Sequence, residues 1–440
     1  MVRILITNAY SWYNKGDAGI LIGMFFSLRK YIPNASISIM SRTPQIDSVK
    51  YSKYGIGVLR DFVILTSNKQ RKILKELHLL IIMFISAIWL SINKRQKKEI
   101  KLPLIDADMY KTLRWYRDAD IVISCGGGFL HDSAGYTFLI HLYSIFLALL
   151  LNKPTVLYAQ SIGPFKNKLY KWITKSILNK VSLITVREKI SYKYLLEMGI
   201  NKPRIILTAD SAFVINSISE NKAKQLLLEE GIILNDSPLI GVTVRHWVFP
   251  RSKNIDRKHI EFVRKMTEII NYLIERKSAT IIFLPQAINP YDIKSDDRNV
   301  AIQIFHRTKY KRNVNVLEKD FSPEELKGIS GLMDIFIGTR MHSNIFAASM
   351  GTPVIAIEYL PKTRGIMSML GLDEYVQDIT DIDIDSIILN IEKAFKNKEV
   401  IREKLIRITK EVEQLALYNG KLIADLINDT SINANRLRFN

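Results

Sequence analysis

Arg340 and His342 stand two residues apart, directly after a mostly apolar run at 333–337 that has the composition of a buried strand. A guanidinium is a permanent cation that binds carboxylates and phosphates through paired hydrogen bonds. An imidazole titrates near neutral pH and is the side chain most often used to move protons in catalysis. Neither side chain helps to build a core at a strand end, so this spacing indicates a site that binds an anion and transfers protons.

Other polar or small residues follow short apolar runs in the same way. They are Gln160, Arg187, Asp210, Arg245, Gln286 and the triplet Gly126, Gly127 and Gly128. The carboxyl ends of parallel strands meet at one edge of a sheet, where ligands bind, so we expect these residues to line one cleft. The glycines let the backbone approach a neighbour or an anion closely, or they form a tight packing turn. They lack the G-x-G-x-x-G spacing of a nucleotide fingerprint.

The apolar runs predict the elements that position these residues. Short β-branched segments alternate with helical patterns, which is typical of parallel sheets covered on both faces. The expected strands are Val2–Thr7, Ile37–Met40, Ala119–Ser124, Thr155–Ala159, Leu183–Val186, Ile205–Thr208, Leu239–Val244, Thr280–Leu284, Ile335–Ile337 and Pro353–Ile357. The predicted fold class is α/β, with two Rossmann-like, doubly wound domains facing across a cleft.

A length of 440 residues exceeds what one core supports, so two domains are expected. The sequence turns polar after the strand near 205–208. We therefore predict an N-terminal domain at 1–215 with an apolar and basic insertion at about 71–101, a linker region at 216–237, a C-terminal domain at 238–385 and C-terminal helices at 386–440.

Composition excludes several classes of protein. Apolar residues make up 48% and charged residues 24%, which is ordinary for a globular chain and argues against disorder. The single cysteine, Cys125, excludes a disulfide framework and a Cys-rich metal site, and no metal is expected. The first residues have the pattern of a buried strand and not of a secretory signal, so we expect a cytoplasmic location.

The formal net charge of +20 predicts an anionic partner, but charge alone does not choose among nucleic acid, acidic lipid and a phosphorylated substrate. No zinc-finger spacing or RNA-binding aromatic signature is present, so no nucleic-acid partner is expected.

One apolar segment has basic flanks. Residues 77–92 hold 13 apolar residues in 16, with eight Lys and Arg residues between 71 and 101. As a helix this segment reaches about 24 Å, short of the ~30 Å hydrocarbon core of a bilayer. One interpretation is a helix lying on an anionic membrane surface, with Trp89 at the boundary, which would place the protein at the inner face of the plasma membrane. The alternative is a buried core helix with solvated basic ends.

The order of motifs resembles the polysaccharide pyruvyl transferase family from about residue 3 to 375. The matching motifs are Asn14-Lys15-Gly16-Asp17-Ala18, the Gly triplet, Gln160-Ser161-Ile162-Gly163-Pro164, Arg187-Glu188 with Ser191, Asp210 with Ala212-Phe213, Gly338 with Arg340 and His342, and Gly351 with Pro353. The resemblance implies two Rossmann-like halves arranged as in GT-B glycosyltransferases, with the acceptor on the N-terminal side and the donor on the C-terminal side.

The resemblance also implies an activity, which is transfer of pyruvate from phosphoenolpyruvate to two hydroxyls of a sugar, giving a cyclic ketal and phosphate. The acceptor would be a cell-surface polysaccharide or a lipid-linked oligosaccharide precursor. Phosphoenolpyruvate is a donor substrate, and no cofactor is implied.

The motifs carry residue roles with them. His342 is expected to be the general acid and base, and Arg340, Met341 and Arg187 are expected to contact the donor. Lys362, in the stretch Tyr359-Leu360-Pro361-Lys362, and Arg245 are further candidates for binding the donor's anionic groups.

The loop that holds Gly16 is expected to contribute Asn14 and Asp17 to the acceptor, because amide and carboxylate side chains hydrogen-bond hydroxyls. Gly16, Gly127, Gly128, Gln160, Asp210 and Gln286 are expected to line the cleft.

Two other functions remain open at this point. A GT-B-type glycosyltransferase would use a nucleotide-sugar on the same frame, with Glu358 as the candidate ribose ligand. A non-catalytic protein that binds anionic lipid or polysaccharide would also explain the charge.

Overall fold

The computed structural model describes residues 1–62, 72–93, 105–132, 135, 137–246, 254–290 and 292–436, without the side chains of 72–80, 361 and 430–436. The chain divides into two units. Unit 1 holds residues 1–12, 20–211 and 415–440, and unit 2 holds residues 13–19 and 212–414. The segment 13–19 therefore belongs to unit 2 although it lies near the start of the chain, and the end of the chain belongs to unit 1. Residues 216–237, expected as a linker, lie in unit 2.

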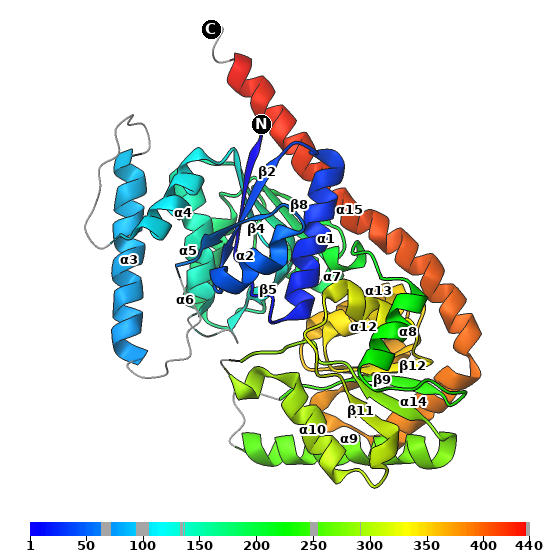
Figure 1. Ribbon diagram of the computed structural model, residues 1–440. Helices are drawn as coiled ribbons and strands as arrows, with labels where there is room; N and C mark the ends of the chain where they lie inside the picture. The colour runs from blue at the N-terminus through cyan, green and yellow to red at the C-terminus, as the bar shows by residue number, and fades with distance from the viewer. Residues whose placement is uncertain are drawn as a thin grey trace. The chain divides into compact units, whose positions relative to one another are not determined.

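The sheet of unit 1 has the strand order β3-β2-β1-β4-β6-β7-β8, with β5 paired to β6, and all its paired strands are parallel. Figure 1 draws this sheet with its helices. Its strands are β1 (Arg3–Thr7), β2 (Ser36–Ser41), β3 (Gly57–Arg60), β4 (Ile121–Ser124), β5 (Gly127–Leu130), β6 (Thr155–Ile162), β7 (Leu183–Val186) and β8 (Arg204–Leu207). Its helices are α1 (Lys15–Tyr31), α2 (Pro44–Ser52), α3 (Lys72–Asn93), α4 (Ala107–Asp118), α5 (Thr137–Leu150), α6 (Lys168–Leu178) and α7 (Lys189–Glu197), of which α1 begins in unit 2.

The sheet of unit 2 has the order β11-β10-β9-β12-β13-β14 and is also parallel. Its strands are β9 (Leu239–Thr243), β10 (Thr280–Phe283), β11 (Val314–Val316), β12 (Ile335–Gly338), β13 (Val354–Glu358) and β14 (Val376–Asp378). Its helices are α8 (Glu220–Glu229), α9 (Ile255–Lys277), α10 (Asp297–Arg307), α11 (Pro323–Ser330), α12 (Met341–Ser349), α13 (Pro361–Met369), α14 (Ile384–Lys396) and the first part of α15 (Lys398–Arg436). Each unit is thus an open parallel sheet with helices packed on it, and the α/β prediction of two Rossmann-like domains is confirmed.

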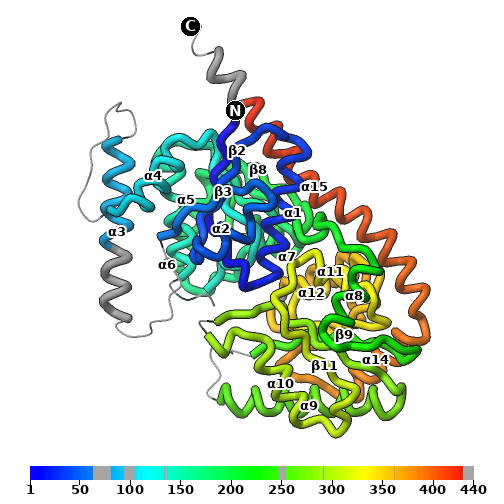
Figure 2. Tube along the Cα trace, in the orientation of Figure 1, coloured from blue at the N-terminus to red at the C-terminus, as the bar shows by residue number. Residues whose placement is uncertain are grey.

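The last part of α15 packs in unit 1, beside α1 (Figure 2). The hydroxyl of Ser27 donates to the carbonyl of Leu417 at 3.0 Å, and a Cβ at Gly420 would lie 2.4 Å from the carbonyl oxygen of Ser27. The two helix backbones therefore touch, and only a glycine fits at position 420.

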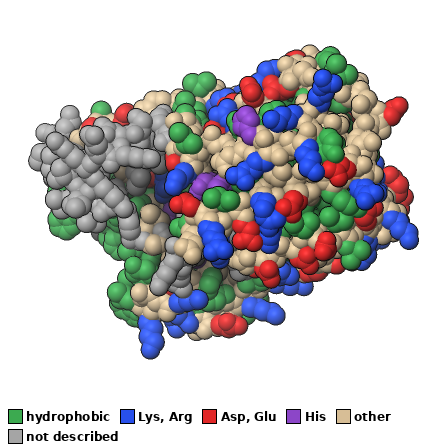
Figure 3. Space-filling model, turned by 90° about the horizontal axis from the view of Figure 1, so that it is seen from below, with side chains coloured by type: hydrophobic (Ala, Val, Ile, Leu, Met, Phe, Trp, Pro, Cys, Tyr) green, Lys and Arg blue, Asp and Glu red, His purple; other side chains and the backbone are tan. Residues whose placement is uncertain are grey.

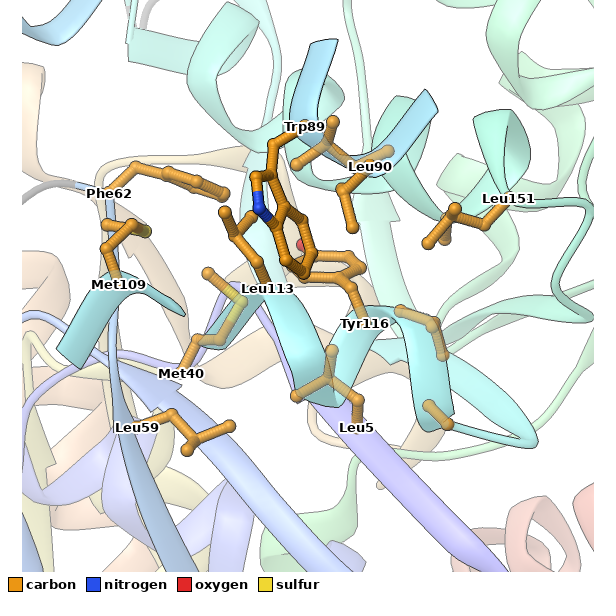
Figure 4. Close-up of a cluster of buried hydrophobic side chains, with 14 of the residues drawn as sticks. Leu5, Met40, Leu59, Phe62, Trp89, Leu90, Met109, Leu113, Tyr116 and Leu151 are labelled. Atoms are coloured by element: carbon orange, nitrogen blue, oxygen red, sulfur yellow. The ribbon is translucent and has the colours of Figure 1, made fainter. Parts of the chain in front are cut away.

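The apolar segment near 77–92 forms most of α3, and one face of this helix is part of the core of unit 1. Trp89 and Leu90 are fully buried and pack with Leu113 and Tyr116 of α4 (Figure 4). The prediction that Trp89 lies at a membrane boundary is therefore wrong, because its ring fills a gap between α3 and α4. On the rest of the helix Phe84 is 68% exposed.

None of the helices in the described ranges combines the length and apolar composition needed to cross a bilayer. The basic flanks at 94–101 lie outside the described residues. On the face drawn in Figure 3, Lys and Arg side chains are interspersed with Asp and Glu, so the net positive charge does not collect into one patch there.

Two strand ends differ from the predictions. The strand that begins at Thr155 continues to Ile162, so Gln160 lies on β6 and does not follow it; Ala159, with φ 44°, sits where the register to β7 shifts. Gly127 and Gly128 lie on β5, so the glycine triplet does not form only a turn.

Candidate functional site

The topology of unit 2 creates one place where neighbouring loops diverge. From β9 the chain passes to β10 and β11 on one side, and β12 then pairs with the other side of β9. In open parallel sheets, ligands bind at the carboxyl ends of the two strands that flank such a switch. Arg245 follows β9 by two residues and Arg340 follows β12 by two residues, so both arginines lie at this switch.

Arg340 is held by a buried carboxylate. Its Nε donates to Asp297 Oδ2 at 3.1 Å and its second nitrogen bonds Oδ1, which makes a bidentate pair. The Asp297 side chain is 2% exposed. It also accepts hydrogen bonds from the backbone N–H groups of Gln286 at 3.1 Å and Ala287 at 3.0 Å. Burial alone would lower the pKa of Arg340, but Asp297 outweighs burial and raises it. Arg340 is therefore a fixed cation whose charge is already compensated.

Arg245 has a different environment. Its guanidinium carbon lies 4.2 Å from the centroid of the Tyr359 ring, and its Nε donates to the carbonyl of His246 at 3.5 Å. Burial lowers the pKa of Arg245. Among the carboxylates of the described ranges, none forms an ion pair with it. Arg245 is therefore an enclosed cation whose charge is available to a bound anion.

Tyr359 directly follows β13 and lies among cations. Burial would raise the pKa of its phenol, but Arg245, Lys362 and Arg340 together lower it to about 8. Asp17 acts in the opposite direction. A phenol with this pKa exchanges its proton near neutral pH, which an ordinary tyrosine does not do.

The segment 13–19 completes this neighbourhood. Asn14 pairs with Ala287 in an antiparallel bridge, and the backbone N–H of Lys15 donates to the carbonyl of Gln286 at 2.7 Å. The ammonium of Lys15 forms an ion pair with Asp320. These bonds fix the start of α1 against the loop that follows β10.

The start of α1 lies against His342, the second residue of α12. A Cβ placed on Gly16 would come within 2.3 Å of His342 Nδ1, so the imidazole packs directly on the Gly16 backbone. Asp17, the next residue, acts electrostatically on both Arg340 and Tyr359. The structure therefore places Asn14, Gly16 and Asp17 in the same unit as the arginines and the histidine.

Gln286 indicates that this neighbourhood is built for a ligand. The residue is 1% exposed, and within the described ranges neither atom of its side-chain amide has a hydrogen-bond partner. A buried amide without partners costs about 1–3 kcal/mol. A ligand that hydrogen-bonds this amide recovers that cost.

Other predicted site residues lie in unit 1. Arg187 is fully buried, donates to Asp210 at 2.6 Å and to Ser161 at 2.8 Å, and has one terminal nitrogen without a partner in the described ranges. The Gln160 amide nitrogen donates to Ser124 at 2.8 Å, and Gly127 pairs with Gln160 across β5 and β6. Gly128 follows Gly127 on β5. Met341, which was also predicted to contact the donor, lies instead in unit 2, at the start of α12, and is 3% exposed.

Two residues of the unit 2 site escaped the sequence prediction. Tyr359 follows a strand as the predicted residues do, so the same rule would have found it. Asp297 stands beside Asp296 at the start of α10, where acidic residues commonly cap a helix. That pattern conceals the role of Asp297 as partner of Arg340.

Known structures share this fold. UDP-GlcNAc 2-epimerase from Methanocaldococcus jannaschii is 14% identical, with a TM-score of 0.55, 89% of this chain covered and 92% of that chain. HepE from Anabaena, solved with UDP-glucose, is 12% identical with a TM-score of 0.58, covering 98% of this chain and 100% of that chain. These neighbours are GT-B epimerases and glycosyltransferases, and the chain has the GT-B fold.

A relative in sequence spans nearly the whole protein. The amylovoran biosynthesis protein AmsJ from Erwinia amylovora is 27% identical over 426 residues, which cover 97% of this chain and 99% of AmsJ. Residues 14–361 match the polysaccharide pyruvyl transferase family. Except for Lys362, this range contains all the site residues described above in unit 2, which are Asn14, Gly16, Asp17, Arg245, Gln286, Asp297, Arg340, His342 and Tyr359. The chain belongs to the polysaccharide pyruvyl transferase family, whose members are transferases of polysaccharide biosynthesis.

Proposed function

We propose that this protein transfers pyruvate from phosphoenolpyruvate to two hydroxyls of a sugar in a polysaccharide or its precursor, forming a ketal and releasing phosphate. The observation that carries the proposal is Arg245 in unit 2, an enclosed cation without a carboxylate partner in the described ranges, in a chain of this family.

The donor carries a carboxylate and a phosphate, and both require cations. Arg340 is paired with Asp297, so Arg245 supplies the main charge for the donor's oxygens, and Lys362 stays a further candidate. The buried amide of Gln286 supplies a donor and an acceptor at the same site. Arg187 lies in unit 1 and has one terminal nitrogen without a partner in the described ranges; its role as a donor ligand stays a prediction.

The reaction moves two protons, and the site holds two groups suited to them. Each attacking hydroxyl loses one proton. One proton adds to the terminal carbon of the enol, which becomes the ketal methyl group, and the other leaves with phosphate. We assign the carbon-bound proton to His342 and the second to Tyr359, whose pKa of about 8 lets the phenol accept and return a proton.

Phosphate release tests the proposal. The purified chain is mixed with phosphoenolpyruvate and the organism's own polysaccharide, from which ketals have been removed by mild acid. Phosphate and a new ketal methyl signal by proton NMR are expected in equal amounts. Absence of both would refute the proposal, and release of UDP from UDP-glucose in a parallel reaction would favour the glycosyltransferase alternative.

The environment of Glu358 leaves that alternative open to the same test. Glu358, the candidate ribose ligand, is 8% exposed and accepts a hydrogen bond from Arg364 at 2.8 Å. Both bonds from Arg364 go to Oε1, whereas Oε2 is buried and has no hydrogen-bond partner in the described ranges, so a ribose hydroxyl could bind Oε2 without breaking the ion pair.

We also propose a peripheral location at the inner face of the plasma membrane, with a lipid-linked acceptor. The support is the outer face of α3, where Ile81, Phe84 and Ile92 are each at least 40% exposed. Large apolar side chains on one helix face are suited to the boundary of an anionic bilayer.

A further inference from the structure

Unit 1 has the same kind of topological switch as unit 2, and the proposed donor site does not use it. From β1 the chain passes to β2 and β3 on one side, and β4 pairs with the other side of β1. The residues that follow β1, β2 and β3 are Asn8, Arg42 and Asp61. These polar side chains lie where the ligand of an open parallel sheet binds.

His141 of α5 organises this group, and its tautomer follows from its neighbours. The Asn8 amide nitrogen donates to Ser124 Oγ at 3.0 Å and to the carbonyl of His141 at 3.2 Å. The Asn8 Oδ1 atom then accepts a hydrogen bond from the N–H group at His141 Nδ1, at 3.0 Å. His141 Nε2 must therefore be the acceptor of this ring.

Two donors from other elements point at that acceptor. The Tyr10 hydroxyl lies 3.2 Å and an Arg42 terminal nitrogen 3.3 Å from His141 Nε2. Burial and then Arg42 hold the pKa of His141 well below its usual value, so the imidazole stays neutral. A neutral acceptor fixed in this way sets the positions of both Tyr10 and Arg42.

Arg42 is also paired with Asp61. Its Nε lies 3.5 Å from Asp61 Oδ2, and its guanidinium carbon lies 5.2 Å from the centroid of the Tyr10 ring. The Arg42 side chain is 15% exposed and that of Asp61 is 4% exposed, while Tyr10 is half-buried. The group therefore presents hydrogen-bond donors, acceptors and an aromatic ring, with no net charge.

This chemistry contrasts with the unit 2 site, where three cations surround Tyr359. An anionic ligand gains little from an arginine already neutralised by Asp61. A neutral sugar gains more, because an Arg and Asp pair can hydrogen-bond two adjacent hydroxyls and an aromatic ring packs against the apolar face of the sugar.

We propose that Tyr10, Arg42 and Asp61, positioned by Asn8 and His141, form the binding site for the sugar acceptor, and that the bound unit is a neutral hexose. The inference rests on the proposed function only in calling the bound sugar the acceptor of the reaction. Binding of a sugar at this site is tested independently of that reaction. It differs from the prediction that Asn14 and Asp17 bind the acceptor, since those residues lie in unit 2.

The test is direct binding to the full chain, observed by saturation-transfer NMR with methyl hexosides and methyl hexuronides as probes. Arg42→Gln and the milder Tyr10→Phe are compared with wild type. The matched control is Arg60→Gln, which removes another arginine of unit 1 that is paired with an aspartate, Asp106, outside this group. Thermal melting checks that each variant is folded, and calorimetry with phosphoenolpyruvate measures donor binding independently.

Wild type and Arg60→Gln are expected to bind neutral hexosides with equal affinity. The affinity should be lower by about tenfold or more in Arg42→Gln, with a smaller loss in Tyr10→Phe. Donor affinity should be the same in all four proteins. The assignment would be overturned if Arg42→Gln and Tyr10→Phe both bound the sugar as tightly as wild type does. A preference of wild type for hexuronides, or no binding of any hexoside, would also overturn it. Failure of wild type to bind or consume phosphoenolpyruvate would instead refute the proposed function and leave the sugar result to be judged alone.

Discussion

Arg245 and Arg340 flank the same switch in unit 2, yet replacing each by Gln should have opposite consequences. Arg340 is bonded bidentately to Asp297, which is almost fully buried, whereas Arg245 forms no ion pair in the described ranges. Arg340→Gln should therefore reduce stability, and Arg245→Gln should reduce donor affinity.

The magnitudes follow from these environments. Arg340→Gln leaves a buried carboxylate without its cation, a change that costs about 3–5 kcal/mol and lowers the melting midpoint by about 6–20 °C. Arg245→Gln removes hydrogen bonds between charged groups, worth about 1.5–3 kcal/mol, so the donor's Kd should rise about tenfold to a hundredfold. Its melting midpoint should stay close to that of wild type.

Two assays separate the outcomes. Calorimetric titration with phosphoenolpyruvate gives the donor Kd, and thermal unfolding gives stability. A third readout is the Tyr359 phenolate absorbance near 295 nm, because loss of Arg245 should raise the Tyr359 pKa above about 8. If Arg245→Gln binds the donor as wild type does while a stable Arg340→Gln does not, the division of roles between the two arginines is refuted.

Three further predictions concern single side chains. His342→Gln should slow pyruvyl transfer by about a hundredfold to ten-thousandfold while calorimetric donor affinity stays near wild type; turnover at the wild-type rate would remove His342 from the chemistry. Because the Tyr359 pKa is lowered from near 10 to about 8, its ionisation adds stability that appears as pH rises from 8 to 10 and is absent below 8. Tyr359→Phe should lose this gain in melting experiments between pH 7 and 10, and an unchanged pH profile would contradict the cation environment. Phe84→Ser should weaken flotation with anionic liposomes, whereas Leu228→Ser, with a similarly exposed side chain on α8, should not; equal flotation of both would exclude α3 as the contact.

The scaffold was largely predictable because buried parallel strands have a strong local pattern. The runs that became β1, β4, β7, β9, β10, β12 and β13 are apolar and rich in β-branched residues, and burial on both faces requires that composition. The strands β3, β5, β11 and β14 were missed. β3, β11 and β14 are short strands at the edge of a sheet, and β5 begins with two glycines, a residue type depleted in strands. The position of polar residues at strand ends also predicted Arg245, Arg340 and His342 as site residues, because it depends only on the order of the sequence.

Only the tertiary structure decided which of these groups carry free charge. Arg340 and Asp297 are 43 residues apart, so nothing local in the sequence pairs them. Nor does the local sequence indicate that Arg245 forms no ion pair with a carboxylate of the described ranges. The structure also showed that Asn14 and Asp17 belong to unit 2 and that Trp89 is buried in the core of unit 1. Both results depend on which surfaces meet when the chain folds. Residue type and local periodicity are properties of the sequence, whereas charge compensation and burial are set by neighbours that the fold brings from distant parts of the chain.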